Sequence, residues 1–437
     1  MNPLLSRREL LGALAAAAAL GPQSATGQTF PAERVPALPD QLWRWVAAQL
    51  VLEPGLVWLD TATLGPTLRA VLVRQYRQLE AQSLDLHDYA AAFGTDGPGV
   101  RSALESAARF LGADPGELAL THGARAGLAH VAAGIDLQRG DSVLTTLLEH
   151  PAAVYPWLVQ ARRRGIDVVQ LPATVAPATP ESIVRQFEAA LGPRTRVLLL
   201  SHVREADGTV LPVAELCALA RSRGILSVVD GTAAAGHIDL ALAGLGCDVY
   251  ATGLDRWLNG PVDAGLLYVR RESQQSIWPG APEGAAGWDT RDRYDQPVPT
   301  LPDPALAAQA RFGADLTRRG PIVAAMPLAF EFQDAVVRPR LQQRIRQLAA
   351  QFRAGIASIR GIEVLTPEHA SLNAGIVAFR VAGRDQEALA ENIAHDDRIV
   401  LGSVRRGPAY AVLRASLHPA NDAIDVDRCV AAIQRRT

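Results

Sequence analysis

Short apolar runs rich in β-branched residues alternate with longer helical patterns over residues 99–270. The runs predict seven strands, at 117–121, 142–146, 167–171, 196–201, 226–230, 248–252 and 265–270. Apolar residues recur at helical spacing in the intervening segments 99–112, 152–165, 180–191 and 212–224. This alternation is typical of a mainly parallel sheet that helices cover on both faces. Ligands of such folds bind beyond the carboxyl ends of the strands, where His150, Asp230 and Arg256 fall.

The remainder of the chain predicts a second, smaller lobe. Residues 273–310 are rich in Gly, Pro, Asp and Gln and predict a loop or linker, and a long helical stretch follows at about 321–360. The strand-like runs "IEVLTP" and "NAGIVAFRV" and a closing helix after Asp425 complete an α+β pattern. We therefore expect an α/β protein with four segments: a signal at 1–28, an N-terminal segment at 29–58, a large domain at 59–300 with a seven-stranded sheet, and a small C-terminal domain at 301–437.

The first residues predict an export signal. Arg7 and Arg8 precede an Ala-rich apolar run that ends at Gly21-Pro22, and small residues suited to cleavage follow between about Ala25 and Gln28. The stretch "SRRELLG" resembles the twin-arginine signal of bacteria. An ordinary secretory signal or a retained anchor is the alternative. We expect a periplasmic or secreted protein with no membrane segment after signal removal.

Charge and cysteine content exclude several classes of function. A formal net charge of −2 gives no reason to expect a nucleic-acid partner or an anionic membrane surface. Three scattered cysteines, Cys217, Cys247 and Cys429, are too few for a disulfide framework or a zinc site. We expect no metal centre.

Four blocks resemble, in order, those of the class V aminotransferase family, in its isopenicillin N epimerase-like and cysteine desulfurase-like branch. They are "WLDTATLGP" (58–66), "LTTLLEHPAAVYPW" (144–157), "LSHVREADGTVLPVAELCALARSRGILSVVDG" (200–231) and "LRASLHPANDAIDVDRCVAAI" (413–433). The resemblance implies the aspartate aminotransferase fold, which is fold type I of the pyridoxal-phosphate (PLP)-dependent transferases. It also implies a homodimer with its pocket at the subunit interface, and a substrate that is an amino acid or amine.

The resemblance assigns roles to individual residues. Asp230 matches the acid that pairs with the pyridine nitrogen, His150 the ring-stacking histidine, and Arg414 the clamp for the substrate carboxylate. Thr317 matches a phosphate contact that comes from the neighbouring subunit. A turn-capping Asp230, a loop histidine at position 150 and a structural ion pair at Arg414 are the simpler readings.

The lysine that should bind the cofactor aldehyde is missing. All 43 residues counted as Lys or Arg are arginine, and Arg256 stands at the Schiff-base position. A guanidinium stays protonated and is a poor nucleophile, so arginine cannot replace that lysine. Other residues that contact the cofactor in the family are also replaced. The residues now at these positions are Gly253, Asp255, Ala233, Glu205 and, at the start of the phosphate-binding helix, Ala124 and Arg125.

Three hypotheses follow, and whether the chain is an enzyme stays open between them. The first is a pseudoenzyme in which Arg256 pairs with Asp230. The second is a non-standard enzyme of aminotransferase, epimerase or lyase type, which holds PLP or pyridoxamine phosphate non-covalently with Arg125 and Arg256 on the phosphate and with His150 or Asp255 as base. The third is a binder of a small anionic ligand through Arg125, Arg256 and Arg414.

Overall fold

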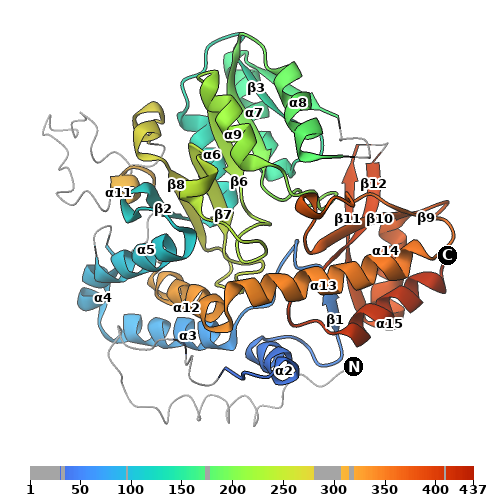
Figure 1. Ribbon diagram of the computed structural model, residues 1–437. Coiled ribbons are helices and arrows are strands. Elements are labelled where there is room, and N and C mark those ends of the chain that lie inside the picture. Colours follow the sequence, from blue (N-terminus) through green and yellow to red (C-terminus); the bar gives the residue numbers. More distant parts are fainter. Residues whose placement is uncertain are drawn as a thin grey trace, which may run out of the picture.

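The chain folds into two lobes (Figure 1). The computed structural model describes residues 30, 35–94, 97–172, 178–279, 307–313, 319–407 and 410–437. The predicted signal at 1–28 and Thr317 lie outside the described residues. No helix among the residues described is long and apolar enough to cross a membrane.

The large lobe is built on a seven-stranded sheet with the strand order β2-β8-β7-β6-β5-β3-β4. Its strands are β2 (Leu118–Thr121), β3 (Ser142–Thr146), β4 (Asp167–Leu171), β5 (Thr195–Ser201), β6 (Leu226–Asp230), β7 (Val249–Gly253) and β8 (Gly265–Val269). Neighbours from β4 to β7 pair in parallel, and β8 is antiparallel to both β2 and β7. The predicted sheet is confirmed, and each strand bound falls within one residue of the prediction.

Helices cover both faces of this sheet because its strands are apolar on both sides. Successive residues of β5 alternate between two core clusters: Leu198 and Leu200 face one, Val197 and Leu199 the other. One cluster includes α5 (Pro98–Leu111), α8 (Pro180–Ala190) and α9 (Val213–Ser222), and the other includes α6 (Gly123–Gly134), α7 (Pro151–Arg164) and α11 (Ala307–Phe312). Each fully buried Leu or Val contributes about 1.5–3 kcal/mol, so the alternation fixes the register.

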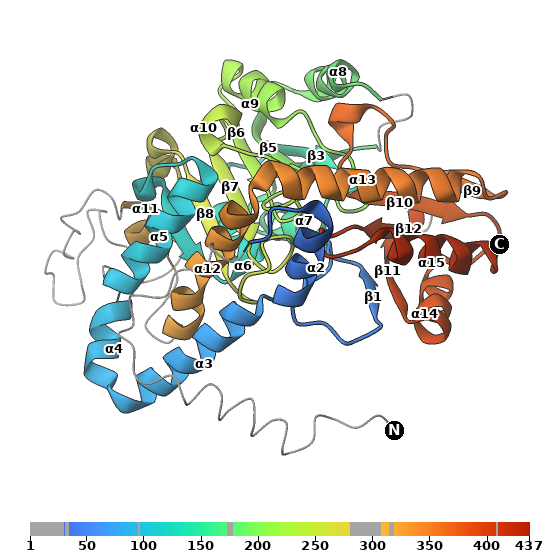
Figure 2. The ribbon, with the colours of Figure 1, turned by 60° about the horizontal axis from the view of Figure 1, so that its bottom comes forward.

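The small lobe contains a five-stranded sheet in the order β1-β11-β12-β10-β9. Its strands are β1 (Val57–Leu59), β9 (Ile362–Val364), β10 (Ile376–Val381), β11 (Ile399–Arg406) and β12 (Tyr410–Ser416). Figure 2 shows α13 (Arg338–Ala357), α14 (Gln386–Asp397) and α15 (Ala423–Gln434) around this sheet. The N-terminal segment contributes β1, which pairs in parallel with β11. The sequence did not predict β11 and β12.

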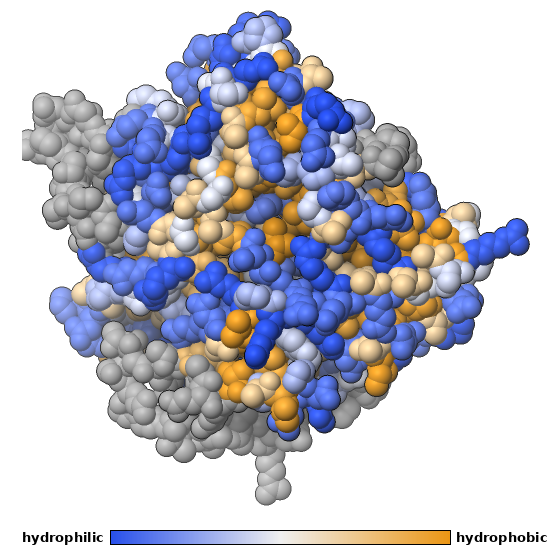
Figure 3. All heavy atoms as spheres, viewed as in Figure 1, coloured by the Kyte–Doolittle hydropathy of each residue, from blue (hydrophilic) through white to orange (hydrophobic). Residues whose placement is uncertain are grey.

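The prediction of one continuous helix at 321–360 is wrong, because the structure has two helices there, α12 (Gly320–Val336) and α13. They meet at Val337, whose φ of 70° interrupts the helical backbone. Helix α12 packs against α3 (Arg69–Leu84) and α5, while α13 packs on the small lobe. Figure 3 shows mainly hydrophilic side chains along α13, as its many Arg and Gln residues require.

The remaining described elements are short or peripheral. They are α2 (Pro39–Gln49), α4 (Leu86–Phe93), α10 (Leu242–Leu245) and the 3-10 helices Pro115–Glu117, Arg271–Ser276 and Ala370–Leu372.

Candidate functional site

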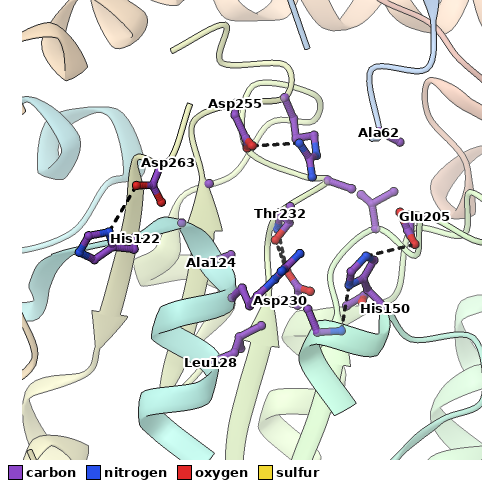
Figure 4. A pocket seen from close by; sticks show the side chains of 18 of the residues that line it. Ala62, His122, Ala124, Leu128, His150, Glu205, Asp230, Thr232, Asp255 and Asp263 are labelled. Atoms are coloured by element: carbon purple, nitrogen blue, oxygen red, sulfur yellow. Dashed lines mark hydrogen bonds and ion pairs between the residues drawn. The ribbon is translucent and has the colours of Figure 1, made fainter. Parts of the chain in front are cut away.

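A cavity of about 400 Å³ lies beyond the carboxyl ends of the central strands of the large sheet. Ser201 ends β5, Asp230 ends β6 and Gly253 ends β7, and all three line the cavity. His150 and Arg256 also line it, and Figure 4 shows His150 and Asp230 at the cavity. The volume is in the range of small-molecule sites.

The loop after β7 places Arg256 in the cavity wall. Trp257 is buried, stacks on His237 with ring centroids 4.0 Å apart, and donates from Nε1 to the Leu417 carbonyl at 2.8 Å. On the other side, Gly65 lies directly against this loop, because a Cβ on Gly65 would be 1.9 Å from the Arg256 carbonyl oxygen. Contacts on both sides therefore hold this loop in place.

Arg256 pairs with its sequence neighbour Asp255. The distance between Arg256 Nη1 and Asp255 Oδ2 is 3.0 Å, and the two side chains are 19% and 22% exposed. The expected pair between Arg256 and Asp230 is therefore wrong. Asp255 also folds back over Gly253, where a Cβ would be 2.8 Å from Asp255 Oδ1. The absence of a side chain at position 253 makes room for the new ion pair.

Asp230 is a buried acid without a guanidinium partner among the described residues. Thr232 donates from its backbone N–H, at 2.9 Å, and from its hydroxyl to Asp230 Oδ1. Burial raises the pKa of Asp230, and the two Thr232 hydrogen bonds and nearby His150 only partly offset that effect. A protonated nitrogen of a ligand would stabilise the charged form of this carboxyl group.

His150 lies where a ring in the cavity would meet it. The residue caps α7, and its Nδ1 accepts a hydrogen bond from the Ala152 N–H at 3.0 Å. With Nδ1 an acceptor, the proton of the neutral ring is on Nε2, which lies 3.8 Å from Glu205 Oε1. The hydrogen bond at Nδ1 therefore orients a ring that lines the cavity.

The first turn of α6 supplies the basic part of the wall. His122, Gly123, Ala124 and Arg125 line the cavity, and no side chain caps the helix. Gly265 permits this approach, since a Cβ there would be 2.4 Å from the Gly123 Cα. Uncapped N–H groups at the start of a 12-residue helix attract an anion. Arg125 is exposed and has no ion-pair partner among the residues that the structure covers.

The structure places Arg414 in β12, behind the cavity wall. Its guanidinium is buried and bonds to Asp60, Thr63 and Glu205. Burial lowers the pKa of Arg414, but Glu205 and Asp60 outweigh that effect and raise it. The role of Arg414 as a substrate clamp stays a prediction, and so does the phosphate contact assigned to Thr317, which lies outside the described residues.

Glu149 is a buried acid that was not among the residues predicted for the site. Its carboxyl group accepts hydrogen bonds from Thr146 Oγ1, at 2.8 Å, and from the cavity-lining Ser201 Oγ. Burial raises its pKa to about 7, although Ser201, Arg204 and Thr146 act in the opposite direction. Its position in the apolar run "LLEH", one residue before His150, is the signal that could have found it.

Counting only the residues that the structure describes, the ionic groups of the lining leave one acid and one cation without an ion-pair partner. Asp255 pairs with Arg256, Asp263 pairs with Arg319 at 2.8 Å, and Glu205 pairs with Arg406 and Arg414. Asp230 and Arg125 remain. Within the described ranges, no group of His, Cys, Asp and Glu side chains could hold a metal ion, and all three cysteines are buried and unpaired.

Comparison with known proteins identifies the family. The aminotransferase class-V model matches residues 57–429. Isopenicillin N epimerase of Amycolatopsis lactamdurans is 31% identical over 90% of this chain and 98% of that protein, and cysteine desulfurase of Yersinia pseudotuberculosis is 27% identical over 93% and 98%. A lysine-to-alanine mutant of C-DES, with glycine covalently linked to its PLP cofactor, superposes with a TM-score of 0.73 at 23% identity, over 87% of this chain and 97% of that one. The chain belongs to the class V aminotransferase family.

Proposed function

We propose that this protein is a pseudoenzyme of its family, which binds a small ligand in the ancestral cavity without Schiff-base chemistry. One observation carries the proposal: Asp230 and Arg125 both line the cavity without an ion-pair partner among the described residues, and the chain contains no lysine. A ligand that combines an anionic group with a protonated nitrogen satisfies both. Phosphate or carboxylate would lie at Arg125 and the α6 N-terminus, and the nitrogen at Asp230.

The charges of the lining limit which small anionic ligands can bind in the cavity. The lining contains four carboxylates (Glu205, Asp230, Asp255, Asp263) and two guanidiniums (Arg125, Arg256). A purely anionic molecule would meet Asp230 without compensation. A phosphate ester that carries a basic nitrogen fits better.

Covalently anchored PLP does not fit this cavity, because no residue of the chain offers a lysine amine. Non-covalent binding of the same molecule fits better: Arg125 and the α6 start would hold its phosphate, Asp230 its ring nitrogen and His150 its ring face. PLP supplies an electron sink for carbanions when it is bound. The hydroxyl groups that the family uses for phosphate are absent from this helix start, where Gly123, Ala124 and Arg125 stand.

A lysine-free enzyme is the second candidate. The C-DES mutant supports it, because that lysine-to-alanine variant is described with glycine linked to its PLP. The surroundings of the two residues that could serve as the catalytic base are unfavourable for proton abstraction. Asp255 Oδ2 is 3.0 Å from the Arg256 guanidinium, and His150 presents Nε2 toward Glu205. We therefore favour ligand binding without turnover over lysine-free catalysis.

Calorimetric titration with pyridoxamine phosphate tests the binding site. This probe carries a phosphate and a basic ring nitrogen, and it has no aldehyde. We expect one saturable site per chain, and we expect Arg125→Gln to weaken binding about tenfold or more through the loss of a charge-assisted contact. Arg139→Gln, outside the cavity lining, is the matched control and should bind as the wild type does. Absence of binding, or equal binding by the Arg125 variant, contradicts the proposal.

We further propose export by the twin-arginine route, on the strength of Arg7, Arg8 and the apolar run that follows. In a bacterial host with this pathway, the wild type should be found in the periplasm and shortened at its N-terminus. Arg7→Lys combined with Arg8→Lys should keep the full-length protein in the cytoplasm. Cell fractionation shows the compartment of each protein, and mass spectrometry shows whether its N-terminus has been removed. Equal export of the double variant and the wild type would refute the twin-arginine route.

We also propose that a second copy of the chain covers the face formed by α6 and α7. A second cavity, of about 580 Å³, shares Arg125, His150 and Ala152 with the first and continues onto Tyr155 and Val159. Tyr155 is 61% and Val159 is 52% exposed, and exposed apolar patches of this kind are typical of protein interfaces. Light scattering should give twice the chain mass, and Tyr155→Arg with Val159→Arg should give the monomer mass.

A further inference from the structure

Arg414 has no free donor for a ligand. Its Nε and Nη2 donate to Asp60 Oδ1 at 3.4 and 3.1 Å, and Nη2 also donates to Thr63 Oγ1. Its Nη1 donates to the carbonyl oxygen of Glu205 at 3.2 Å and to Glu205 Oε2 at 2.7 Å. The side chain is 3% exposed, so water does not compete for these bonds.

Glu205 is held between two guanidiniums from neighbouring strands of the small lobe. Oε2 contacts Arg414 of β12 at 2.7 Å, and Oε1 contacts Arg406 of β11 at the same distance. His150 Nε2 approaches Oε1 at 3.8 Å, on the side where Glu205 lines the cavity. Burial raises the pKa of Glu205, but Arg414, His150 and Arg406 outweigh it and keep the pKa low. The group is a charged carboxylate at neutral pH.

Two guanidiniums that converge on one carboxylate form a carboxylate-binding seat, defined here by Arg414 and Arg406. The chain itself fills this seat. A ligand carboxylate could enter only by displacing Glu205, which would leave a partly buried charge without a partner. A protonated amine, in contrast, would approach the Oε1 edge of Glu205 from the cavity, beside His150, and would leave both guanidinium contacts in place.

We propose that Glu205 is a specificity-determining residue: its carboxylate fills the seat of Arg414 and Arg406, so the cavity rejects a ligand carboxylate at this end and accepts an amine there. The filled seat is a property of the chain alone. The consequence for ligands rests on the proposed binding function, and it selects amines that lack an adjacent carboxylate.

Chemical rescue tests the seat without reference to any ligand. Glu205→Ala should lower the melting temperature, and sodium acetate should restore part of the loss while sodium chloride at equal ionic strength does not. The wild type should respond equally to both salts. Glu363→Ala, which breaks the exposed pair with Arg380, is the matched control and should show no acetate-specific recovery. Equal effects of acetate and chloride on Glu205→Ala would overturn the proposal.

Two probes that differ only by a carboxylate test the consequence. Phosphoethanolamine and phosphoserine share a phosphate and an ammonium group, and the wild type should bind the former about tenfold more tightly or better. Glu205→Ala should reverse this preference. Equal wild-type affinities would overturn the specificity even if the variant does not fold. If neither probe binds but acetate rescues Glu205→Ala, the proposed binding function is refuted. The filling of the Arg414 and Arg406 seat by Glu205 is then still supported.

Discussion

Asp230→Asn should weaken binding of pyridoxamine phosphate and at the same time stabilise the free protein. The variant keeps an oxygen for the Thr232 hydrogen bonds but cannot pair with a protonated ring nitrogen. Truncation of one partner of a buried charge pair costs about 2–5 kcal/mol, which corresponds to a loss of affinity of about 30-fold or more. Calorimetric titration measures this effect.

The gain in stability follows from the raised pKa of Asp230, which burial causes. A raised pKa in the folded state means that the stabilising contribution is complete below the unfolded pKa and is lost as the pH rises through the folded pKa. Asparagine resembles the neutral form and avoids that loss. The variant should therefore be more stable than the wild type at neutral pH and similar to it in acid, as measured by urea unfolding.

Asp248→Asn is the control variant, for which we expect the opposite change in stability. Asp248 is also buried, but it lies at the other end of β7 and bonds to Ser227, Ser273 and Arg270. Burial raises its pKa, yet these partners outweigh burial and lower it. This variant should lose stability at neutral pH and bind the probe normally. A loss of affinity in both variants, or in neither, would contradict the role of Asp230.

Glu149→Gln should stabilise the protein above neutral pH. Burial raises the pKa of Glu149 to about 7 from an ordinary value of 4.5. By the same linkage, the wild type loses stability as the pH rises from about 4.5 through about 7, and glutamine does not. At pH 8 the variant should be more stable by about 3 kcal/mol, because each unit of pKa shift corresponds to about 1.4 kcal/mol.

Urea unfolding at several pH values checks this expectation. The difference between Glu149→Gln and the wild type should vanish near pH 4 and be greatest above pH 7. Glu363→Gln, on the exposed side of the small sheet, should follow the wild type within about 0.5 kcal/mol throughout. Parallel pH profiles for Glu149→Gln and the wild type would show that the acid is not held neutral by burial.

The large lobe could be predicted because local patterns determine it. Runs such as "VLLLS" are apolar on both faces, and only a strand covered on both sides accommodates them. The small lobe was predicted less well. Strand β11 carries an exposed charge at Arg405 and β12 a buried one at Arg414, and the break at Val337 depends on a positive φ at a residue type that rarely adopts it.

The position of the site could also be predicted, but its charge pairing could not. Asp230 and His150 follow strands, so their place at the sheet edge is fixed by topology. The pairing of Arg256 with Asp255 depends on the conformation of one loop. The pairing of Arg406 with Glu205 joins residues that are 201 positions apart. Such choices arise from tertiary packing, and they determine which charges remain for a ligand.

We expect the cavity to bind its ligand without cofactor chemistry. The most direct test follows the absorbance spectrum of the protein saturated with pyridoxamine phosphate after addition of pyruvate or 2-oxoglutarate. The spectrum should change no faster than that of pyridoxamine phosphate alone in the same buffer. Faster appearance of the pyridoxal phosphate absorbance would show transamination, and the protein would then be a lysine-free enzyme.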